Sequence, residues 1–144
     1  MKKAIKTSIS LLLALIVVLS LASCDYFNRR ELPEIWQDAI YVKDTEVGEG
    51  SKTFTLKVEV EENSVTFTVH TDAETVGEAL LELGLLAGDE SQYGLYIKQV
   101  NGMTADYDVD QTYWAFYING EYAMTGVDTT PITEGEIYSL VRSR

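Results

Sequence analysis

Residues that usually carry catalysis are scarce in this sequence, whereas aromatic residues are concentrated in one short stretch. The 144 residues include one cysteine, Cys24, and one histidine, His70. The sequence has no Ser-His-Asp set, zinc-ligand cluster or glycine-rich phosphate loop, so we expect no enzymatic activity, no metal site and no cofactor. Residues 112–128 (TYWAFYINGEYAMTGVD), in contrast, place five aromatic residues around the pair Asn119-Gly120.

The cysteine follows a segment with the layout of a secretory signal. A basic opening, MKKAIK, precedes residues 9–22, which are apolar apart from serines. That run is shorter than the ~20 apolar residues that span a membrane. It ends in LASC, which resembles the lipobox of bacterial lipoproteins. The resemblance implies that residues 1–23 are a lipoprotein signal peptide and that Cys24 is the lipidated N-terminus; the alternative is an ordinary secretory signal with a chance cysteine.

Charge narrows the choice of partners. The chain has 23 acidic and 11 basic side chains, a net charge of −12, and the basic opening belongs to the signal. Nucleic-acid binding requires Lys and Arg against phosphates, so we expect no nucleic-acid partner. We expect an extracytoplasmic lipoprotein whose partners are the membrane, through its lipid anchor, and a transporter or another envelope protein.

Hydrophobic periodicity predicts a tether over residues 24–52 and a folded domain over residues 53–144. Residues 54–61 and 64–71 alternate apolar and polar side chains, as two half-buried strands of a hairpin do. The spacing then becomes helical, with a capping box at Thr75 and Glu78. The apolar stripe of this helix is Val76, Ala79, Leu80 and Leu83, and Gly84 or Gly88 suits its C-terminal cap.

The remaining residues predict further hairpins. Asn101-Gly102 and Asn119-Gly120 each follow an apolar run, and Asn-Gly is the strongest local signal for a two-residue turn. A last strand is expected over residues 136–142. The order is β-β-α-β-β-β-β, which predicts an α+β fold with one helix packed on a mostly antiparallel sheet built from hairpins.

The turn at Asn119-Gly120 divides the aromatic residues between two faces. One face has Trp114, Phe116, Ile118 and Ala123, and the other has Tyr113, Ala115, Tyr117, Tyr122 and Met124. The first face is expected to be core. The second is then an exposed apolar patch, which commonly marks a binding site, unless the tether covers it, for example through Trp36.

Several short motifs in residues 93–142 resemble the C-terminal domain of the transcobalamin and intrinsic factor family, closest in its bacterial versions, called DUF4430. These motifs include Tyr93-Gly94, Val100-Asn101-Gly102 and Thr112-Tyr113-Trp114. The resemblance covers about residues 53–144 and implies a β-grasp-like fold and a link to cobalamin or another corrinoid. The ligand-binding residues that it implies are Tyr93, Gly94, Leu95, Trp114, Ala115, Phe116, Tyr117 and Asn119.

The chemistry of a corrinoid agrees with these residue types. A corrin ring is a wide apolar disk fringed with amides, so aromatic faces suit the disk and Asn119 suits the amides. The animal carriers hold the corrinoid between this domain and a larger helical barrel that these residues do not include, so we expect weaker binding here. The alternative is a non-enzymatic protein-interaction or cell-envelope module that uses the same fold without a corrinoid.

Two other candidate sites receive little support. Asp106, Asp108 and Asp110 spell D-x-D-x-D, but an EF-type calcium loop also needs Gly at position six and Glu at position twelve. Those positions hold Gln111 and Tyr117, which favours a solvated turn. His70 alternates onto the outward face of its expected strand and is interpreted as a surface residue.

Replacing Cys24 by Ser tests the anchor. Because the thiol is the acceptor of the lipid, Cys24→Ser should release the protein from the membrane and block normal processing of the signal. Membrane fractionation and the N-terminal mass of the product would report both effects. A variant that remains membrane-bound and is cleaved at the same position would contradict the lipoprotein assignment.

Overall fold

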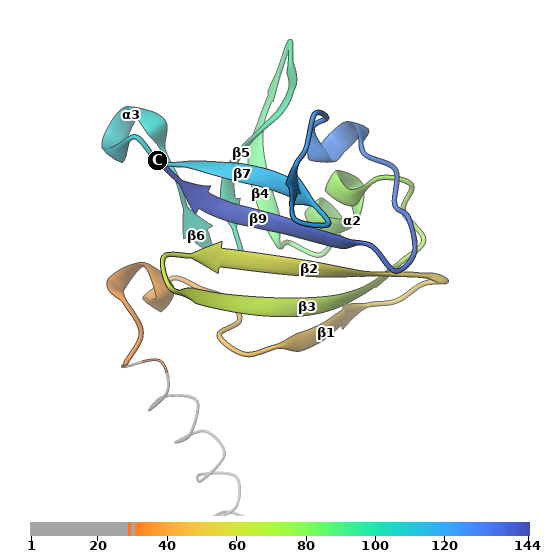
Figure 1. The fold of residues 1–144 in the computed structure, drawn as a ribbon, viewed down its shortest axis with the longest axis horizontal. Coiled ribbons are helices and arrows are strands. Elements are labelled where there is room, and N and C mark those ends of the chain that lie inside the picture. Colours follow the sequence, from red (N-terminus) through yellow and green to blue (C-terminus); the bar gives the residue numbers. More distant parts are fainter. Residues whose placement is uncertain (1–28, 30) are drawn as a thin grey trace, which may run out of the picture. The chain divides into compact units, whose positions relative to one another are not determined.

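The computed structural model describes residue 29 and residues 31–144 (Figure 1). The predicted signal peptide and Cys24 lie outside the described residues. The chain divides into two compact units, Met1–Gln37 and Asp38–Arg144. No helix in the described part is long and apolar enough to cross a membrane.

The second unit contains a six-stranded and a three-stranded sheet. The six-stranded sheet has the order β1-β3-β2-β9-β7-β8. Its strands are β1 (Thr45–Gly48), β2 (Lys52–Val60), β3 (Asn63–Thr71), β7 (Tyr113–Ile118), β8 (Glu121–Tyr122) and β9 (Ile137–Ser143). The pairs β1–β3 and β2–β9 are parallel, and the others are antiparallel. The predicted α+β class is confirmed, but the single predicted sheet is wrong.

The smaller sheet consists of β4 (Leu86–Ser91), β5 (Gly94–Val100) and β6 (Met103–Thr104). Strand β4 was not predicted, because only Leu86 in this strand is buried and no alternation of apolar residues marks it. The pairing of β4 with β5 shifts register between Ala87 and Gly88. A Cβ at Gly88 would lie 2.1 Å from the carbonyl oxygen of Tyr96, so glycine permits this close approach. In Figure 1 the β4–β5 hairpin projects beyond the larger sheet.

The N-terminal hairpin and helix follow the predicted patterns. Every second residue of β2 from Phe54 to Val60 is buried, as are Val65, Phe67 and Val69 of β3. Helix α2 (Val76–Glu82) begins after Thr75, whose hydroxyl accepts from the Glu78 amide at 3.2 Å. The carboxylate of Glu78 accepts in return from the amide of Glu74 at 2.9 Å, one residue earlier than in the standard capping box.

The end of α2 is a Schellman motif at Gly84, one of the two predicted caps. Gly84 has φ of +69°, and its amide donates to the Leu81 carbonyl at 3.1 Å. The Leu85 amide donates to the Leu80 carbonyl at 3.0 Å. These two bonds satisfy carbonyls that the helix leaves open. Gly88, the other candidate, lies in β4.

Part of the predicted tether is folded. Residues Glu34–Gln37 form the 3-10 helix η1 in the first unit, with Trp36 buried. In the second unit, β1 (Thr45–Gly48) pairs with β3. The sheet therefore starts before residue 53, where the sequence placed the domain boundary, because the strand pattern of β1 is only four residues long.

The two Asn-Gly turns have the same backbone but different surroundings. Asn101 and Asn119 have φ of 50° and 49°, and the glycines after them have φ of 82° and 83°. Asn101 is buried; its side-chain oxygen accepts from the Tyr41 amide at 2.9 Å and its side-chain nitrogen donates to the Tyr41 carbonyl at 2.8 Å. The turn at Asn101 therefore also fixes the chain that enters β1.

Alanine at each turn glycine separates backbone strain from steric overlap. Both Gly102→Ala and Gly120→Ala force a side chain into the left-handed region, which costs roughly 1–2 kcal/mol. At Gly102 the new Cβ would also lie 2.4 Å from the Asp38 carbonyl oxygen, whereas at Gly120 nothing lies within 4 Å. We expect urea unfolding to show a further loss of about 1–3 kcal/mol for Gly102→Ala. Equal losses in the two variants would show that the Asp38 approach relaxes freely.

Candidate functional site

The aromatic hairpin has the predicted register. Tyr117 pairs with Tyr122, and Ile118 pairs with Glu121 across the two-residue turn. The amide of Ala123 still donates to the Phe116 carbonyl at 2.9 Å, but the ladder then ends. The chain beyond Ala123 therefore leaves the sheet and can turn toward β5.

The two faces of β7 are only partly separated in the way that the sequence predicts. Trp114 and Phe116 are buried, and the ring of Phe116 stacks on Tyr138 of β9 with centroids 6.0 Å apart. Ala115, assigned to the other face, is buried as well. On that face Tyr117 meets Tyr122 edge to face, with centroids 5.5 Å apart.

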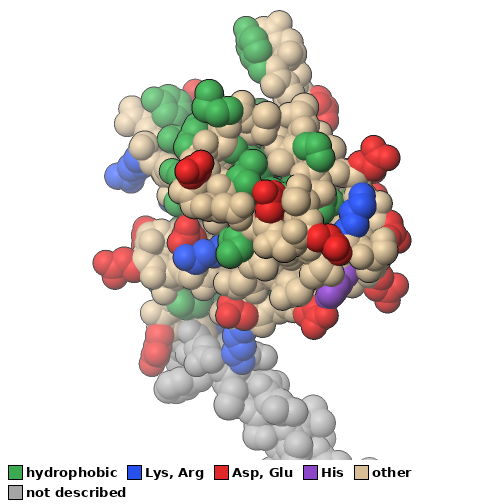
Figure 2. Space-filling view, turned by 45° about the vertical axis from the view of Figure 1, so that its right-hand side comes forward, with side chains coloured by type: hydrophobic (Ala, Val, Ile, Leu, Met, Phe, Trp, Pro, Cys, Tyr) green, Lys and Arg blue, Asp and Glu red, His purple; other side chains and the backbone are tan. Residues whose placement is uncertain are grey.

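A cleft of about 210 Å³ lies where β5, β7 and the chain after β8 meet. Its lining residues are Leu95, Tyr96, Ile97, Tyr113, Trp114, Phe116, Tyr122, Ala123, Thr125, Gly126 and Val127. Four of them are aromatic on β5 or β7, one is aromatic on β8, and none carries a charge. Figure 2 shows hydrophobic side chains gathered below the projecting β4–β5 hairpin, with acidic side chains around the rest of the face.

The cleft brings together three of the eight residues expected to bind a ligand: Leu95, Trp114 and Phe116. Tyr117 instead lines a separate depression of about 280 Å³, together with Glu59, Gly120, Ser139 and Val141. Alternation along β7 explains why Tyr117 leaves the face opposite that of Trp114 and Phe116, although Tyr113, the first residue of the strand, also lines the cleft.

Asn119, Tyr93 and Ala115 are also absent from the cleft lining. The side-chain oxygen of Asn119 accepts from the Ile137 amide at 3.0 Å, and its side-chain nitrogen lies 3.4 Å from Glu136. Tyr93 is 91% exposed at the turn between β4 and β5. Asn119 therefore fastens the turn to the start of β9, which is a structural task that the sequence did not reveal.

Sequence reasoning missed the third wall of the cleft. Residues 125–127 precede or begin the 3-10 helix η2 (Val127–Thr129) and carry no periodic pattern. Tyr96 also went unnoticed, although it directly follows the expected ligand residue Leu95 in the apolar run at 93–100. The aromatic side chain next to Leu95 was a usable signal.

The carboxylate of Asp128 holds two walls of the cleft together. Its Oδ2 accepts from the Leu95 amide at 3.3 Å. A Cβ at Gly94 would lie 2.9 Å from Oδ2, and one at Gly126 would lie 2.7 Å from Oδ1. Gly94, which also has φ of +104°, thus serves the approach of Asp128 and does not itself line the cleft.

Trp114 lines the cleft although most of its side chain is buried. The residue is 6% exposed, and its Nε1 is the one buried side-chain nitrogen or oxygen without a hydrogen-bond partner in the part of the chain that the structure describes. A buried donor left unsatisfied costs about 1–3 kcal/mol. Because Nε1 is inaccessible to solvent while the cleft is empty, this donor does not face the open space of the cleft.

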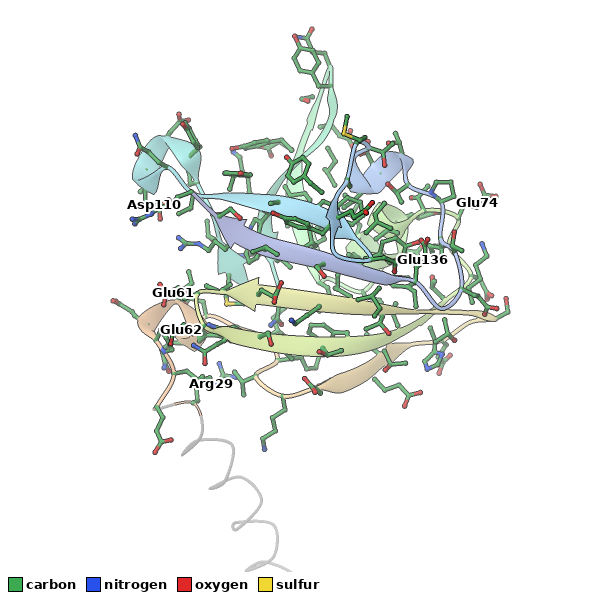
Figure 3. All side chains as sticks on the ribbon, in the orientation of Figure 1. Arg29, Glu61, Glu62, Glu74, Asp110 and Glu136 are labelled. Atoms are coloured by element: carbon green, nitrogen blue, oxygen red, sulfur yellow. The ribbon has the colours of Figure 1, made fainter. Side chains whose placement is uncertain are left out.

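The D-x-D-x-D motif is used inside the protein. Asp106 caps the one-turn helix α3 (Tyr107–Asp110), which the sequence did not predict. Asp110 accepts from the hydroxyl and amide of Thr112 and pairs with Arg142 at 2.7 Å, beside the C-terminal end of β9 (Figure 3). The Thr112 hydroxyl, and to a smaller extent Arg142, holds the pKa of Asp110 below its ordinary value.

The described residues were also considered as possible metal ligands. Within residue 29 and residues 31–144, no three His, Cys, Asp or Glu side chains are grouped so that they could hold an ion. His70 lies on β3, with Nε2 2.5 Å from Glu46 and Nδ1 3.0 Å from Thr53. It therefore joins β1 to β2 across β3, at the sheet edge opposite β8.

Comparison with known proteins identifies the family. Residues 73–137 match the model of the family described as "Domain of unknown function (DUF4430)". The chain also matches a crystal structure of a "putative metal binding protein" from Ruminococcus gnavus at 33% identity, with a TM-score of 0.61. That match covers 65% of this chain and 98% of the other. The chain belongs to the DUF4430 family, as its motifs predict.

A more distant structural match is haptocorrin in complex with Cbi. It shares 19% identity and a TM-score of 0.47, and the match covers 68% of this chain and 27% of haptocorrin. Among curated proteins, none matches the chain.

Removing the Asp128 carboxylate should loosen the cleft wall. Asp128→Ala leaves the Leu95 amide without its acceptor, and a lost hydrogen bond of about 1 kcal/mol corresponds to roughly fivefold faster amide exchange through local opening. Hydrogen exchange measured residue by residue would show this at Leu95. Asp72→Ala is a matched control, because Asp72 accepts from the Ser51 amide at 2.8 Å elsewhere in the domain. Unchanged amide exchange at Leu95 in Asp128→Ala would show that the Asp128 carboxylate does not hold this wall of the cleft.

Proposed function

We propose that this protein is a non-enzymatic binding domain that captures a flat, largely apolar ligand in the cleft between β5 and β7. The observation that carries the proposal is the cleft itself. Its walls are mostly aromatic and aliphatic, the Thr125 side chain is among them, and none of the lining side chains is charged. Such a combination is typical of small-molecule sites, where apolar walls supply affinity and a few polar groups supply orientation.

A corrinoid is the ligand class that we favour. The support comes from the sequence motifs around Tyr93-Gly94 and Thr112-Tyr113-Trp114, and from aromatic walls that suit the apolar face of a corrin. Ligand sites usually have volumes of roughly 300–1,000 Å³, and this cleft has about 210 Å³. It therefore accepts an edge of the disk, and we expect micromolar affinity, roughly −8 kcal/mol.

The proposed location is the outer side of a membrane. The lipobox-like LASC at residues 21–24 supports lipidation of Cys24, and two acyl chains hold a protein stably where one does not. In this position the domain would pass ligand to, or receive it from, a transporter or another envelope protein. The test is the Cys24→Ser variant described above.

A protein-interaction module is the alternative, and exposed apolar side chains favour it. Tyr93 at the hairpin tip is 91% exposed and Met124 beyond β8 is 95% exposed. Large apolar residues at this exposure are typical of protein-binding surfaces as well as ligand sites. In this case the cleft would receive a side chain of a partner protein.

Calorimetry and the visible corrin spectrum, with cobalamin and cobinamide as probes, test the corrinoid proposal. Tyr96→Ala should weaken binding at least about tenfold, because buried aromatic anchors commonly lose ~2 kcal/mol or more on truncation. Tyr107→Ala is the matched control: Tyr107 in α3 is 55% exposed against 43% for Tyr96, and it is not part of the cleft.

The results distinguish a corrinoid-binding cleft from a protein-interaction module. Tyr117→Ala should have little effect on corrinoid binding, since Tyr117 lines the other depression. If neither probe gives heat or a spectral change at high micromolar concentration, the corrinoid proposal fails and the interaction module remains. Equal weakening by Tyr96→Ala and Tyr107→Ala would exclude the cleft as the site.

A further inference from the structure

The cleft between β5 and β7 has aromatic side chains that solvent reaches. Its aromatic lining residues are Tyr96, Tyr113, Trp114, Phe116 and Tyr122. Tyr96 is 43% exposed and Tyr122 is 60% exposed, so a ligand in the open space of the cleft can contact both side chains. The face of an aromatic ring carries partial negative charge and attracts cations. These walls therefore suit a positively charged group as well as an apolar one.

Three acidic residues adjoin the cleft lining. Asp128 and Glu121 are next in sequence to lining residues, and Glu90 is the pairing partner of Leu95 in the β4–β5 ladder. Within residue 29 and residues 31–144, none of these three carboxylates forms an ion pair. Unbalanced negative charge beside an apolar cleft gives the cleft a negative potential, which attracts cations and repels anions.

The cleft has no cation of its own to balance this charge. The basic residue of β5, Lys98, is not part of the lining and pairs with Asp89 of β4 at 2.7 Å. The half-buried Asp128 accepts from the amide of the lining residue Leu95 at 3.3 Å, so its negative charge lies at the cleft wall. A charge in such a position is screened less by water and salt than a fully exposed one. A cation from outside the chain would meet complementary charge here.

The hydrogen-bond acceptors at the cleft indicate which cation fits. A primary ammonium or a guanidinium brings several N–H donors, and each needs an acceptor when it leaves water. The side-chain acceptors in the lining are hydroxyl groups alone. The Gly126 carbonyl already accepts from the Thr130 hydroxyl at 2.7 Å, and the Phe116 carbonyl accepts from the Ala123 amide at 2.9 Å. A quaternary ammonium has no N–H group, so it enters the cleft without leaving a donor unsatisfied.

We propose that the cleft binds a quaternary ammonium group, held against Tyr96 and Tyr122 by cation–π attraction and favoured by the negative charge of Asp128. The inference goes beyond the corrinoid to a different ligand class, and it rests on the proposed function in one respect, that the cleft is a ligand site. The volume agrees with a compact head group, because about 210 Å³ is less than the roughly 300–1,000 Å³ of sites for drug-sized ligands.

Choline and dimethylbutanol test the charge of the ligand directly. They have the same shape, but in dimethylbutanol a carbon replaces the quaternary nitrogen and the molecule is neutral. Titration of the full-length protein, followed by nuclear magnetic resonance of the amides of Leu95, Ile97 and Ala123, would measure both affinities. Choline should bind at least about fivefold more tightly, because cation–π attraction acts on it alone. Equal affinities, or no shift with choline, would overturn the proposal.

Tyr96→Leu keeps an apolar side chain in the cleft and removes the aromatic ring. The preference for choline over dimethylbutanol should fall about threefold or more in this variant. Tyr107→Leu is the matched control and should leave the preference unchanged, because Tyr107 is exposed in α3 and does not line the cleft. An unchanged preference in Tyr96→Leu would overturn the assignment of Tyr96.

Asp128→Asn removes a charge and retains a side-chain oxygen that can accept from the Leu95 amide. Choline affinity should fall about threefold while dimethylbutanol affinity stays the same. Asp44→Asn is the matched control, because Asp44 also accepts from one backbone amide, that of Thr66 at 2.8 Å, and does not line the cleft. Equal losses of choline affinity in the two variants would show that the total charge, and not Asp128, attracts the cation.

Butylammonium and cobinamide complete the experiment. Butylammonium should bind more weakly than choline; tighter binding would overturn the preference for a quaternary nitrogen and would indicate a lysine side chain of a partner protein. If choline binds in the cleft and cobinamide does not, the cation proposal holds and the corrinoid is wrong. If cobinamide binds and choline does not, the corrinoid holds and the cation is wrong. If neither binds, the cleft is not a ligand site and both proposals fail.

Discussion

The close approach of the chain at Asp128 to three glycines is the constraint on which the cleft depends. A Cβ at Gly77 of α2 would lie 2.9 Å from the Cα of Asp128. The glycines at the start of β5 and before η2, Gly94 and Gly126, are equally close to its carboxylate. A larger side chain at any of these positions would have to displace backbone or the carboxylate. The helix, the smaller sheet and η2 are thus held at one point, and the open space beside that point is the cleft.

The opposite wall of the cleft is fixed by β9, the strand that unites the larger sheet. It pairs in parallel with β2 and antiparallel with β7, so it joins the N-terminal hairpin to the aromatic one. Tyr138 on β9 packs edge to face against Phe54 at 5.3 Å and stacks on Phe116 at 6.0 Å. Burial, reinforced by the hydrogen bond to Glu136, raises the pKa of Tyr138 above its ordinary value. Phe116 is therefore positioned by a chain of packed rings that begins in the core.

The features that the sequence predicted well are those set by local rules. Alternation located β2 and β3, helical spacing located α2, and Asn-Gly located both turns, because side-chain periodicity and positive φ act within a few residues. The second sheet was not predictable in this way. Strand β4 has a single buried residue and is held by pairing with β5 across a register shift, so its evidence lies in a partner strand and not in its own pattern.

The candidate site was predicted only in part for the same reason. Leu95, Trp114 and Phe116 were found because their motifs are continuous in the sequence, whereas residues 125–127 reach the cleft through the bond between Asp128 and the Leu95 amide. Tyr117 was assigned to the site by the family resemblance, which does not show which face of β7 meets β5. The packing of the two sheets decides which face of β7 lies against β5, and the spacing of residues within one hairpin does not predict it.

The dimensions and charge of the cleft together limit how the protein can work. An acidic surface, with a net charge of −12, keeps anions at a distance and leaves neutral ligands unaffected. A disk as wide as a corrin would enter the cleft of about 210 Å³ only at its edge, so most of its apolar area would remain uncovered. Affinity depends on how much of the ligand is desolvated and how well the site is preorganised, more than on the number of contacts. A second surface that covers the outer side of the ligand would then raise affinity. Weak binding by the domain alone and dependence on an envelope partner would both follow from the small volume of the cleft.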